Sequence, residues 1–206
     1  MRATAPLPFR LDDEEPEENE VRPAPTAPIM TKFLEARTIL LFGGIDHKLA
    51  QSVATQLLYL DHLSHEPIKL IINSPGGHVE SGDTIHDLLT FIEAPVAVIG
   101  TGWVASAGTH IFLGVPKERR FCLPNTRFLI HQPSGGAMGR AGDIAIQAAE
   151  IVKMRERLAR IIAQETGQPV ERVREDIDHD YWMNVEEAKD YGILGTVVRS
   201  MKEVRI

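Results

Sequence analysis

The chain has 206 residues, a length typical of one large domain or of one domain with an appendage. Its content of 43% hydrophobic and 25% charged residues matches a soluble globular protein and excludes a wholly disordered chain. The net charge of −7 excludes a general nucleic-acid binder, whose surface would be basic.

The first 29 residues differ in composition from the rest of the chain. They hold seven acidic residues, three arginines and six of the 13 prolines. This acidic, Pro-rich tail has too little apolar surface to offset the entropy lost on ordering, so we expect disorder there and a folded domain over residues 30–206. The tail lacks the apolar stretch of a secretory signal. The chain has one cysteine, which fits a reducing compartment, so we expect a cytoplasmic protein.

Apolar runs alternate with amphipathic segments along the domain, which predicts an α/β fold with a largely parallel sheet. Residues 94–115 lack charged side chains, but glycines and a proline interrupt them, so we expect a buried strand and helix rather than a membrane span. The expected strands lie at 38–42, 67–72, 96–99, 127–130 and 196–199. The expected helices lie at 46–62, 79–92, 106–113, 141–165, 170–176 and 184–192.

The first candidate site is the segment Asn-Ser-Pro-Gly-Gly at 73–77, which follows a predicted strand. Ligands of open α/β sheets bind at such strand ends. Two consecutive glycines allow positive φ angles and direct backbone N–H groups toward an oxygen. An ordinary strand-to-helix turn explains the same residues, so the segment alone does not decide between a site and a turn.

The second candidate is Ser106, which is flanked by alanines and followed by Gly108. Small neighbours permit close backbone approach, and a helix that starts here places its positive end beside the hydroxyl. Ser106 is therefore either a nucleophile on a strand-to-helix turn or a helix-capping serine. The G-x-S-x-G pattern of α/β hydrolases is absent.

A histidine and an acidic cluster complete the candidate chemistry. His131 follows a predicted strand and precedes a proline, which suits either a base or a structural histidine. Asp176, Asp178 and Asp180 are either solvated loop charges or the source of one acid that orients His131. With Ser106, these residues supply a nucleophile, a base and an orienting acid. The backbone N–H groups that could form an oxyanion hole are those of Gly77 and Ala107.

Four sequence blocks stand out together, in this order and at this spacing: INSPGG (72–77), ASAG (105–108), RFCLPNTRFLIHQPSGG (120–136) and EEAKDYGIL (186–194). With them the chain resembles the proteolytic subunit of the Clp protease, a family of serine peptidases. The resemblance extends from about Glu35 to Arg199 and implies a ClpP/crotonase-type fold, with a protruding handle built from a strand and a long helix at about 132–165.

The resemblance also implies roles for individual residues. The nucleophile corresponds to Ser106, the base to His131 and the acid of the triad to Asp180. The oxyanion donors correspond to Gly77 and Ala107. The implied substrate-binding residues are Gly76, His78, Val79, Pro133 and Ser134.

Activity and partners follow from the same resemblance. It implies a self-compartmentalising endopeptidase that degrades peptides and unfolded proteins inside two stacked heptameric rings, a tetradecamer, without metal or cofactor. A Clp-type AAA+ unfoldase would deliver substrates, and neither nucleic acid nor membrane is expected as a partner. Two alternatives stay open: a non-proteolytic ring subunit that assembles with a paralogue, and a crotonase-like acyl-CoA enzyme.

Overall fold

The computed structural model describes residues 27–136 and 138–206. The predicted acidic tail, residues 1–29, lies outside the described residues except for its last three. Those three residues begin helix α1 (Ala27–Glu35), so the domain boundary expected at Met30 falls inside a helix. Within the described ranges, no helix combines the length and the apolar character needed to cross a membrane.

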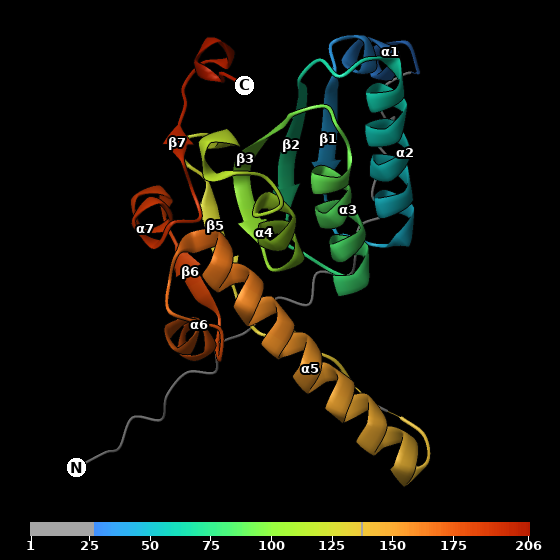
Figure 1. Ribbon diagram of the computed structural model, residues 1–206, viewed down its shortest axis with the longest axis vertical. Coiled ribbons are helices and arrows are strands. Elements are labelled where there is room, and N and C mark those ends of the chain that lie inside the picture. The colour runs from blue at the N-terminus through green and yellow to red at the C-terminus, as the bar shows by residue number, and fades with distance from the viewer. Residues whose placement is uncertain (1–26, 137) are drawn as a thin grey trace, which may run out of the picture.

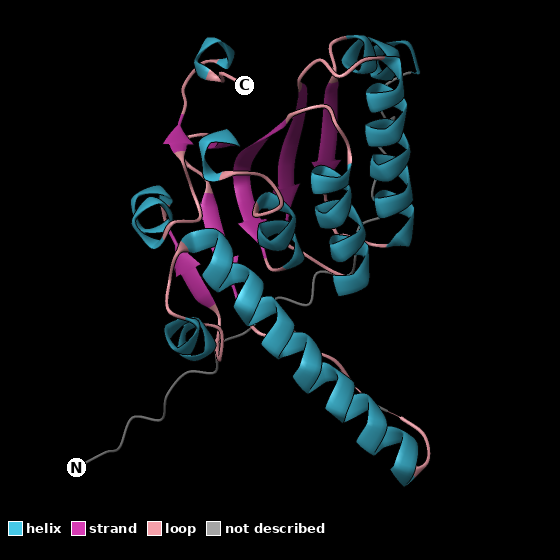
Figure 2. Ribbon diagram, viewed as in Figure 1, coloured by secondary structure: helices cyan, strands magenta, loops and turns pink. Residues whose placement is uncertain are grey.

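A seven-stranded sheet forms the centre of the described fold (Figures 1 and 2). The strand order is β1-β2-β3-β4-β7, while β5 pairs with the end of β3 and with β6. Every pairing is parallel except that of β5 with β6, so the predicted α/β class with a largely parallel sheet is confirmed. The strands are β1 (Thr38–Phe42), β2 (Ile68–Ser74), β3 (Val96–Ala105), β4 (Arg120–Cys122), β5 (Arg127–Ile130), β6 (Tyr181–Met183) and β7 (Thr196–Val197).

The predicted helices are all present, with ends within one or two residues of expectation. Local capping signals explain this agreement: Asp46 accepts a hydrogen bond from the Leu49 N–H, and Asn184 with Glu187 forms a capping box. The helices are α2 (His47–Leu63), α3 (Val79–Phe91), α4 (Ala107–Phe112), α5 (Ala141–Thr166), α6 (Val170–Asp176) and α7 (Val185–Tyr191), with short 3-10 turns at Lys117–Arg119 and Met201–Glu203.

Several strands differ from expectation. The sequence did not predict β4 and β6, because three-residue strands are too short to show a period of two. Strand β3 continues six residues past its expected end, through Gly100 and Gly102, and a bulge opposite Ile72 and Ser74 accommodates the irregular stretch. The last strand is two residues shorter than predicted.

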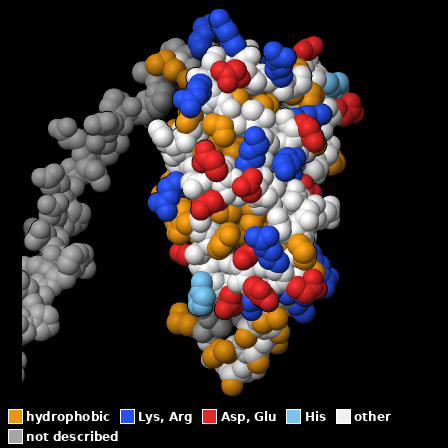
Figure 3. Space-filling view, turned by 90° about the vertical axis from the view of Figure 1, so that its left-hand side faces the viewer, with side chains coloured by type: hydrophobic (Ala, Val, Ile, Leu, Met, Phe, Trp, Pro, Cys, Tyr) orange, Lys and Arg blue, Asp and Glu red, His pale blue; other side chains and the backbone are white. Residues whose placement is uncertain are grey.

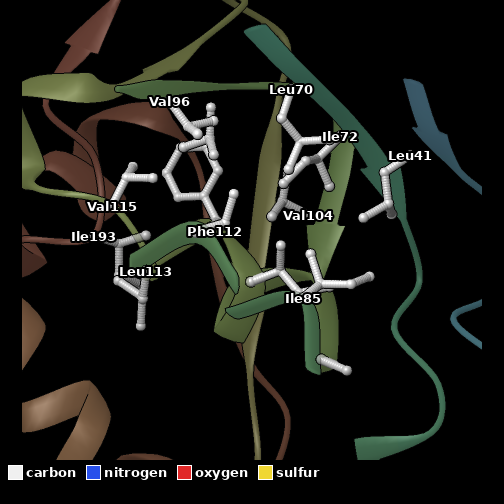
Figure 4. Close-up of a cluster of buried hydrophobic side chains, with 14 of the residues drawn as sticks. Leu41, Leu70, Ile72, Ile85, Val96, Val104, Phe112, Leu113, Val115 and Ile193 are labelled. Carbon is white, nitrogen blue, oxygen red and sulfur yellow. The ribbon is translucent and has the colours of Figure 1, made fainter. Parts of the chain in front are cut away.

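The hydrophobic core lies between the sheet and helices α2, α3 and α4 (Figure 4). Leu70, Ile72 and Val104 extend from the strands toward Ile85 of α3 and Phe112 of α4, and all five side chains are completely buried. Burial of each such side chain contributes about 1.5–3 kcal/mol. This packing fixes the positions of α3 and α4, whose N-terminal ends border the candidate site.

Helix α5 leaves the body of the molecule and projects beyond the sheet (Figure 1). Its buried residues, Leu158, Ala159 and Ile162, belong to the C-terminal half. In the N-terminal half of α5, Ile144 and Ile146 are exposed. Figure 3 shows hydrophobic side chains gathered at this projecting end.

The predicted handle is only partly formed within one chain. Its helix is α5, but residues 132–136 and 138–140 contain no strand, contrary to expectation. A strand requires a neighbouring segment for its hydrogen-bond ladder, and this segment forms no ladder with any other described segment. Its Gly-rich backbone consequently lies beside α5 as an extended loop.

Candidate active site

Ser106 occupies the turn that joins β3 to α4. Its backbone angles, φ 55° and ψ −120°, lie in a region that residues other than glycine rarely adopt. Hydrogen bonds hold the turn: the Ser106 N–H donates to the Leu129 carbonyl at 2.9 Å, and the Thr109 hydroxyl donates to the Val104 and Leu129 carbonyls at 2.7 and 2.8 Å. The strained turn places the Ser106 hydroxyl at the start of α4, where helix dipoles favour negative charge.

The antiparallel pairing of β5 with β6 brings His131 to Asp180. Ile130 pairs with Tyr181 in an antiparallel register. His131, which follows Ile130, therefore lies opposite Asp180, which precedes Tyr181. His131 Nδ1 lies 2.9 Å from Asp180 Oδ1, and His131 Nε2 lies 2.7 Å from Ser106 Oγ. A carboxylate only accepts hydrogen bonds, so Nδ1 donates to Asp180 and Nε2 is free to accept from the serine hydroxyl.

The other two aspartates of the acidic cluster contact different partners. Asp178 accepts a hydrogen bond from Arg155 Nη2 at 2.9 Å. Asp176 accepts one from the Tyr191 hydroxyl at 2.8 Å, and burial together with this carboxylate raises the pKa of Tyr191 well above its ordinary value. Of the three aspartates that the residue patterns left open, Asp180 is the one that contacts His131.

Two backbone N–H groups lie near Ser106. Ile45 forms a parallel β-bridge with Gly77. The Ile45 N–H donates to the Gly76 carbonyl and the His78 N–H donates to the Ile45 carbonyl, both at 2.8 Å, so the bridge leaves the Gly77 N–H unused. Ala107 is the first residue of α4, where N–H groups have no intrahelical partner. A Cβ on Gly76 would approach the Ala107 nitrogen to 3.1 Å, so the two segments lie against each other.

A mostly apolar pocket adjoins Ser106. Its apolar walls come from three directions: Val79 from α3, Ile130 and Pro133 from the end of β5, and Leu158 and Ile162 from α5. An apolar pocket in such a position can hold an apolar side chain of a bound polymer.

The predicted substrate-binding residues divide into two groups. Val79 and Pro133 line the pocket. Gly76 lies directly against Ser106, and His78 Nδ1 accepts from the Ser81 N–H and caps α3. Ser134 is exposed and does not belong to the pocket lining.

Sequence reasoning missed five residues of the pocket, namely Thr109, His110, Ile130, Leu158 and Ile162. The signal at His110 was a polar ring in the short, mostly apolar helix α4, one turn after Ser106.

Comparisons with known proteins identify the family to which the chain belongs. The family model described as Clp protease matches residues 22–201. The ATP-dependent Clp protease proteolytic subunit 3 of Rhizobium johnstonii is 56% identical over 172 residues, 84% of this chain and 89% of the relative. Proteolytic subunit 2 of Gluconobacter oxydans is 50% identical over an alignment of 215 residues, 100% of this chain and 96% of the relative. The structure of ClpP1 from Listeria monocytogenes covers 86% of this chain and 99% of its own, with 48% identity and a TM-score of 0.78. The chain therefore belongs to the Clp protease family and is a peptidase of that family.

Proposed function

We propose that this peptidase is a serine endopeptidase in which Ser106 is the nucleophile, His131 the base and Asp180 the orienting acid. The observation that carries the proposal is the continuous hydrogen-bonded chain from Asp180 through His131 to Ser106, with distances of 2.9 and 2.7 Å. A serine hydroxyl is a weak nucleophile until an adjacent base removes its proton. The proposed chemistry uses only these side chains, backbone N–H groups and water.

The reaction proceeds in two halves. Ser106 Oγ attacks the peptide carbonyl while its proton moves to His131 Nε2, and Asp180 stabilises the resulting imidazolium. His131 then gives this proton to the leaving amine, which departs as the C-terminal product. A water molecule, deprotonated by His131, attacks the acyl-enzyme, and the return of the proton to Ser106 releases the second product.

The N–H groups of Gly77 and Ala107 would stabilise the oxyanion of each tetrahedral intermediate. Support comes from their position: the Gly77 N–H is left unused by the bridge to Ile45, and the Ala107 N–H begins α4 beside the nucleophile. One such donor is typically worth about 2.7–4 kcal/mol in the transition state.

The substrate would bind as an extended peptide between the Gly-rich segment and the start of α3. Residues 133–136 form no ladder with another described segment, so their backbone groups can pair with a peptide as an added strand, whereas the Gln132 N–H already donates to the Ile177 carbonyl at 2.7 Å. Pro133 and Ser134 would lie along one side of the peptide, and Gly76, His78 and Val79 along the other. The pocket beside Ser106 would hold the side chain before the scissile bond, the P1 residue.

Self-assembly would enclose these sites. The projecting half of α5 carries exposed apolar side chains, which large oligomer interfaces usually bury. We propose two stacked heptameric rings joined through α5 and the Gly-rich segment, with the sites facing an inner chamber in the cytoplasm. A Clp-type AAA+ unfoldase would feed unfolded chains into that chamber.

Labelling with a fluorophosphonate probe tests the nucleophile. We expect one adduct on Ser106 in the assembled protein, none in Ser106→Ala, and a strongly reduced yield in His131→Ala. His62→Ala, which changes an exposed histidine of α2, should label like the wild type. Native mass spectrometry should give a multiple of seven subunits, and casein should be degraded faster when a Clp ATPase and ATP are added. An unlabelled assembled wild type would contradict the proposal.

A further inference from the structure

One histidine of the pocket has no part in the proposed mechanism. His110 lies on α4, one turn after Ser106, and is 6% exposed. Besides Ser106 and His131, the other polar side chain of the lining is Thr109, whose hydroxyl is committed to two backbone carbonyls. Among the polar side chains of the pocket lining, His110 is therefore the one that takes part neither in the proposed catalysis nor in holding the turn at Ser106.

Two charged residues fix one edge of the His110 ring. Asp83 Oδ1 lies 2.9 Å from His110 Nε2, and Arg157 binds both oxygens of the same carboxylate, at 2.9 and 2.7 Å. Burial alone would raise the pKa of Asp83, but the hydrogen bonds from His110 and Arg157 outweigh burial and hold that pKa below its ordinary value. Because an ionised carboxylate only accepts hydrogen bonds, His110 donates through Nε2, so in a ring with one proton Nδ1 carries none.

The other nitrogen of the ring is an unused acceptor. His110 Nδ1 is buried and has no hydrogen-bond partner among the described residues. His86 stacks on one face of the ring, with centroids 4.3 Å apart and planes within 3°, so it covers that face without donating to Nδ1. A buried acceptor without a donor is unfavourable, and a bound group that supplies an N–H or O–H recovers that free energy.

We propose that His110 is a specificity-determining residue of this pocket, and that Asp83 and Arg157 are positioning residues that hold its ring. The pocket then accepts apolar P1 side chains and also uncharged P1 side chains that end in a hydrogen-bond donor, such as glutamine, which donates to Nδ1. The inference rests on the proposed function, because the pocket is a P1 site only if Ser106 attacks the adjacent carbonyl.

Methionine and glutamine make a matched pair for the test, since their side chains have the same length and only glutamine carries a donor. Two fluorogenic peptides that differ only in this P1 residue are compared on wild type and His110→Phe, which keeps an aromatic ring against His86 and removes both nitrogens. The Gln/Met ratio of kcat/KM is expected to fall about tenfold in the variant, because the amide loses its acceptor. Asp83→Asn should lower the ratio about threefold by loosening the ring, whereas Asp190→Asn on α7 should leave it unchanged.

A second measurement needs no variant. Methionine sulfoxide has about the length of glutamine and carries an acceptor but no donor, so the wild type should cleave the P1 sulfoxide peptide about tenfold less efficiently than the P1 glutamine peptide. The inference is overturned if the wild type cleaves both equally, if it rejects glutamine while cleaving methionine, or if the Gln/Met ratio is the same in a folded His110→Phe. Fluorophosphonate labelling of Ser106 in the same samples distinguishes failure of this inference from failure of the proposed function. If the wild type is labelled but gives one of the contradicting results, only the role of His110 is refuted. If the wild type is not labelled, the proposed function is refuted.

Discussion

Gly76 lies so close to Ser106 that a Cβ on Gly76 would approach the Ser106 Cβ to 2.6 Å and the Ala105 carbonyl oxygen to 2.8 Å. Its φ angle of +97° is also one that L-amino acids with side chains rarely adopt. The loop after β2 and the turn after β3 are therefore in direct contact at Ser106. Neither segment can shift without displacing the other.

Gly76→Ala is consequently expected to reduce kcat/KM about 100-fold, because a shift of about 1 Å at a reacting group has an effect of that size. Peptide hydrolysis and fluorophosphonate labelling measure the loss. Gly142→Ala is the matched control, since a Cβ there meets nothing within 4 Å and the residue lies in α5. Equal activity of both variants would show that the contact does not position Ser106.

The two aspartates near His131 should differ sharply when each is changed to asparagine. Asp180→Asn is expected to lower kcat about 10³–10⁴-fold, because an amide no longer holds the imidazole in the tautomer that accepts from Ser106. Asp178→Asn weakens the contact to Arg155 but leaves His131 untouched, so kcat per assembled site should change less than tenfold. Steady-state kinetics of assembled fractions, isolated by size-exclusion chromatography, distinguish the two. Equal losses would remove the case for Asp180.

Arg120 is expected to be a large contributor to stability. Its guanidinium is 1% exposed, forms an ion pair with Glu165, and donates to the Val115 and Leu113 carbonyls at 2.7 and 3.0 Å. Arg120→Met should lower the free energy of unfolding by about 3–5 kcal/mol, because it leaves buried acceptors and a carboxylate without their partner.

Urea unfolding measures this loss, and the exposed ion pair between Lys153 and Glu150 supplies its control. Lys153→Met should change the free energy of unfolding by less than about 0.5 kcal/mol. An Arg120→Met protein as stable as Lys153→Met would mean that the buried pair contributes no more than a surface pair.

Cys122 should make stability fall at alkaline pH. Burial raises the pKa of its thiol from the ordinary value of 9.0 to about 12. Between these two values the unfolded chain has lost a proton that the folded chain keeps, so the free energy of unfolding decreases as pH rises, by at most about 1.4 kcal/mol per pH unit. At neutral pH both states keep the proton, and the thiol makes no pH-dependent contribution.

Comparison with Cys122→Ala isolates this thiol from the other groups that titrate in the alkaline range. The wild type should be the more stable protein at pH 7, because the smaller alanine side chain leaves a cavity where the buried Cys122 thiol of β4 was packed. The difference in free energy of unfolding should shrink between about pH 9 and about pH 11. A difference that stays constant over that range would contradict the raised pKa.

Local signals in the sequence were sufficient to predict helices α2 to α7, whereas α1 was not predicted. Asp46 starts α2, the capping box of Asn184 and Glu187 starts α7, and Gly167 ends α5 in a left-handed conformation. Each signal acts within a few residues, so it can be read without knowing the rest of the fold. The same is true of β1, a short apolar run whose predicted bounds are confirmed.

Long-range pairings could not be predicted in this way. Strand β6 consists of Tyr-Trp-Met, three large side chains that show no alternation, so nothing local marks it as a strand. Its register with β5 nevertheless determines that Asp180, and not Asp178, lies opposite His131. The choice of acid therefore depended on the family resemblance, since the residues alone left it open. The pocket was missed for a related reason: Leu158 and Ile162 reach it only because α5 folds back against the start of α4.

The hydrogen bond between His131 and Asp180 joins residues that are 49 positions apart, and all of α5 and α6 lies between them. While a ribosome is still synthesising α5 and α6, the nascent chain contains Ser106 and His131. It contains neither Asp180 nor β6, the strand that aligns Asp180 with His131. No complete Ser-His-Asp arrangement exists until β6 has been synthesised and has paired with β5. The order of the residues along the chain thus delays the assembly of the site until β6, which follows Asp180, has been synthesised.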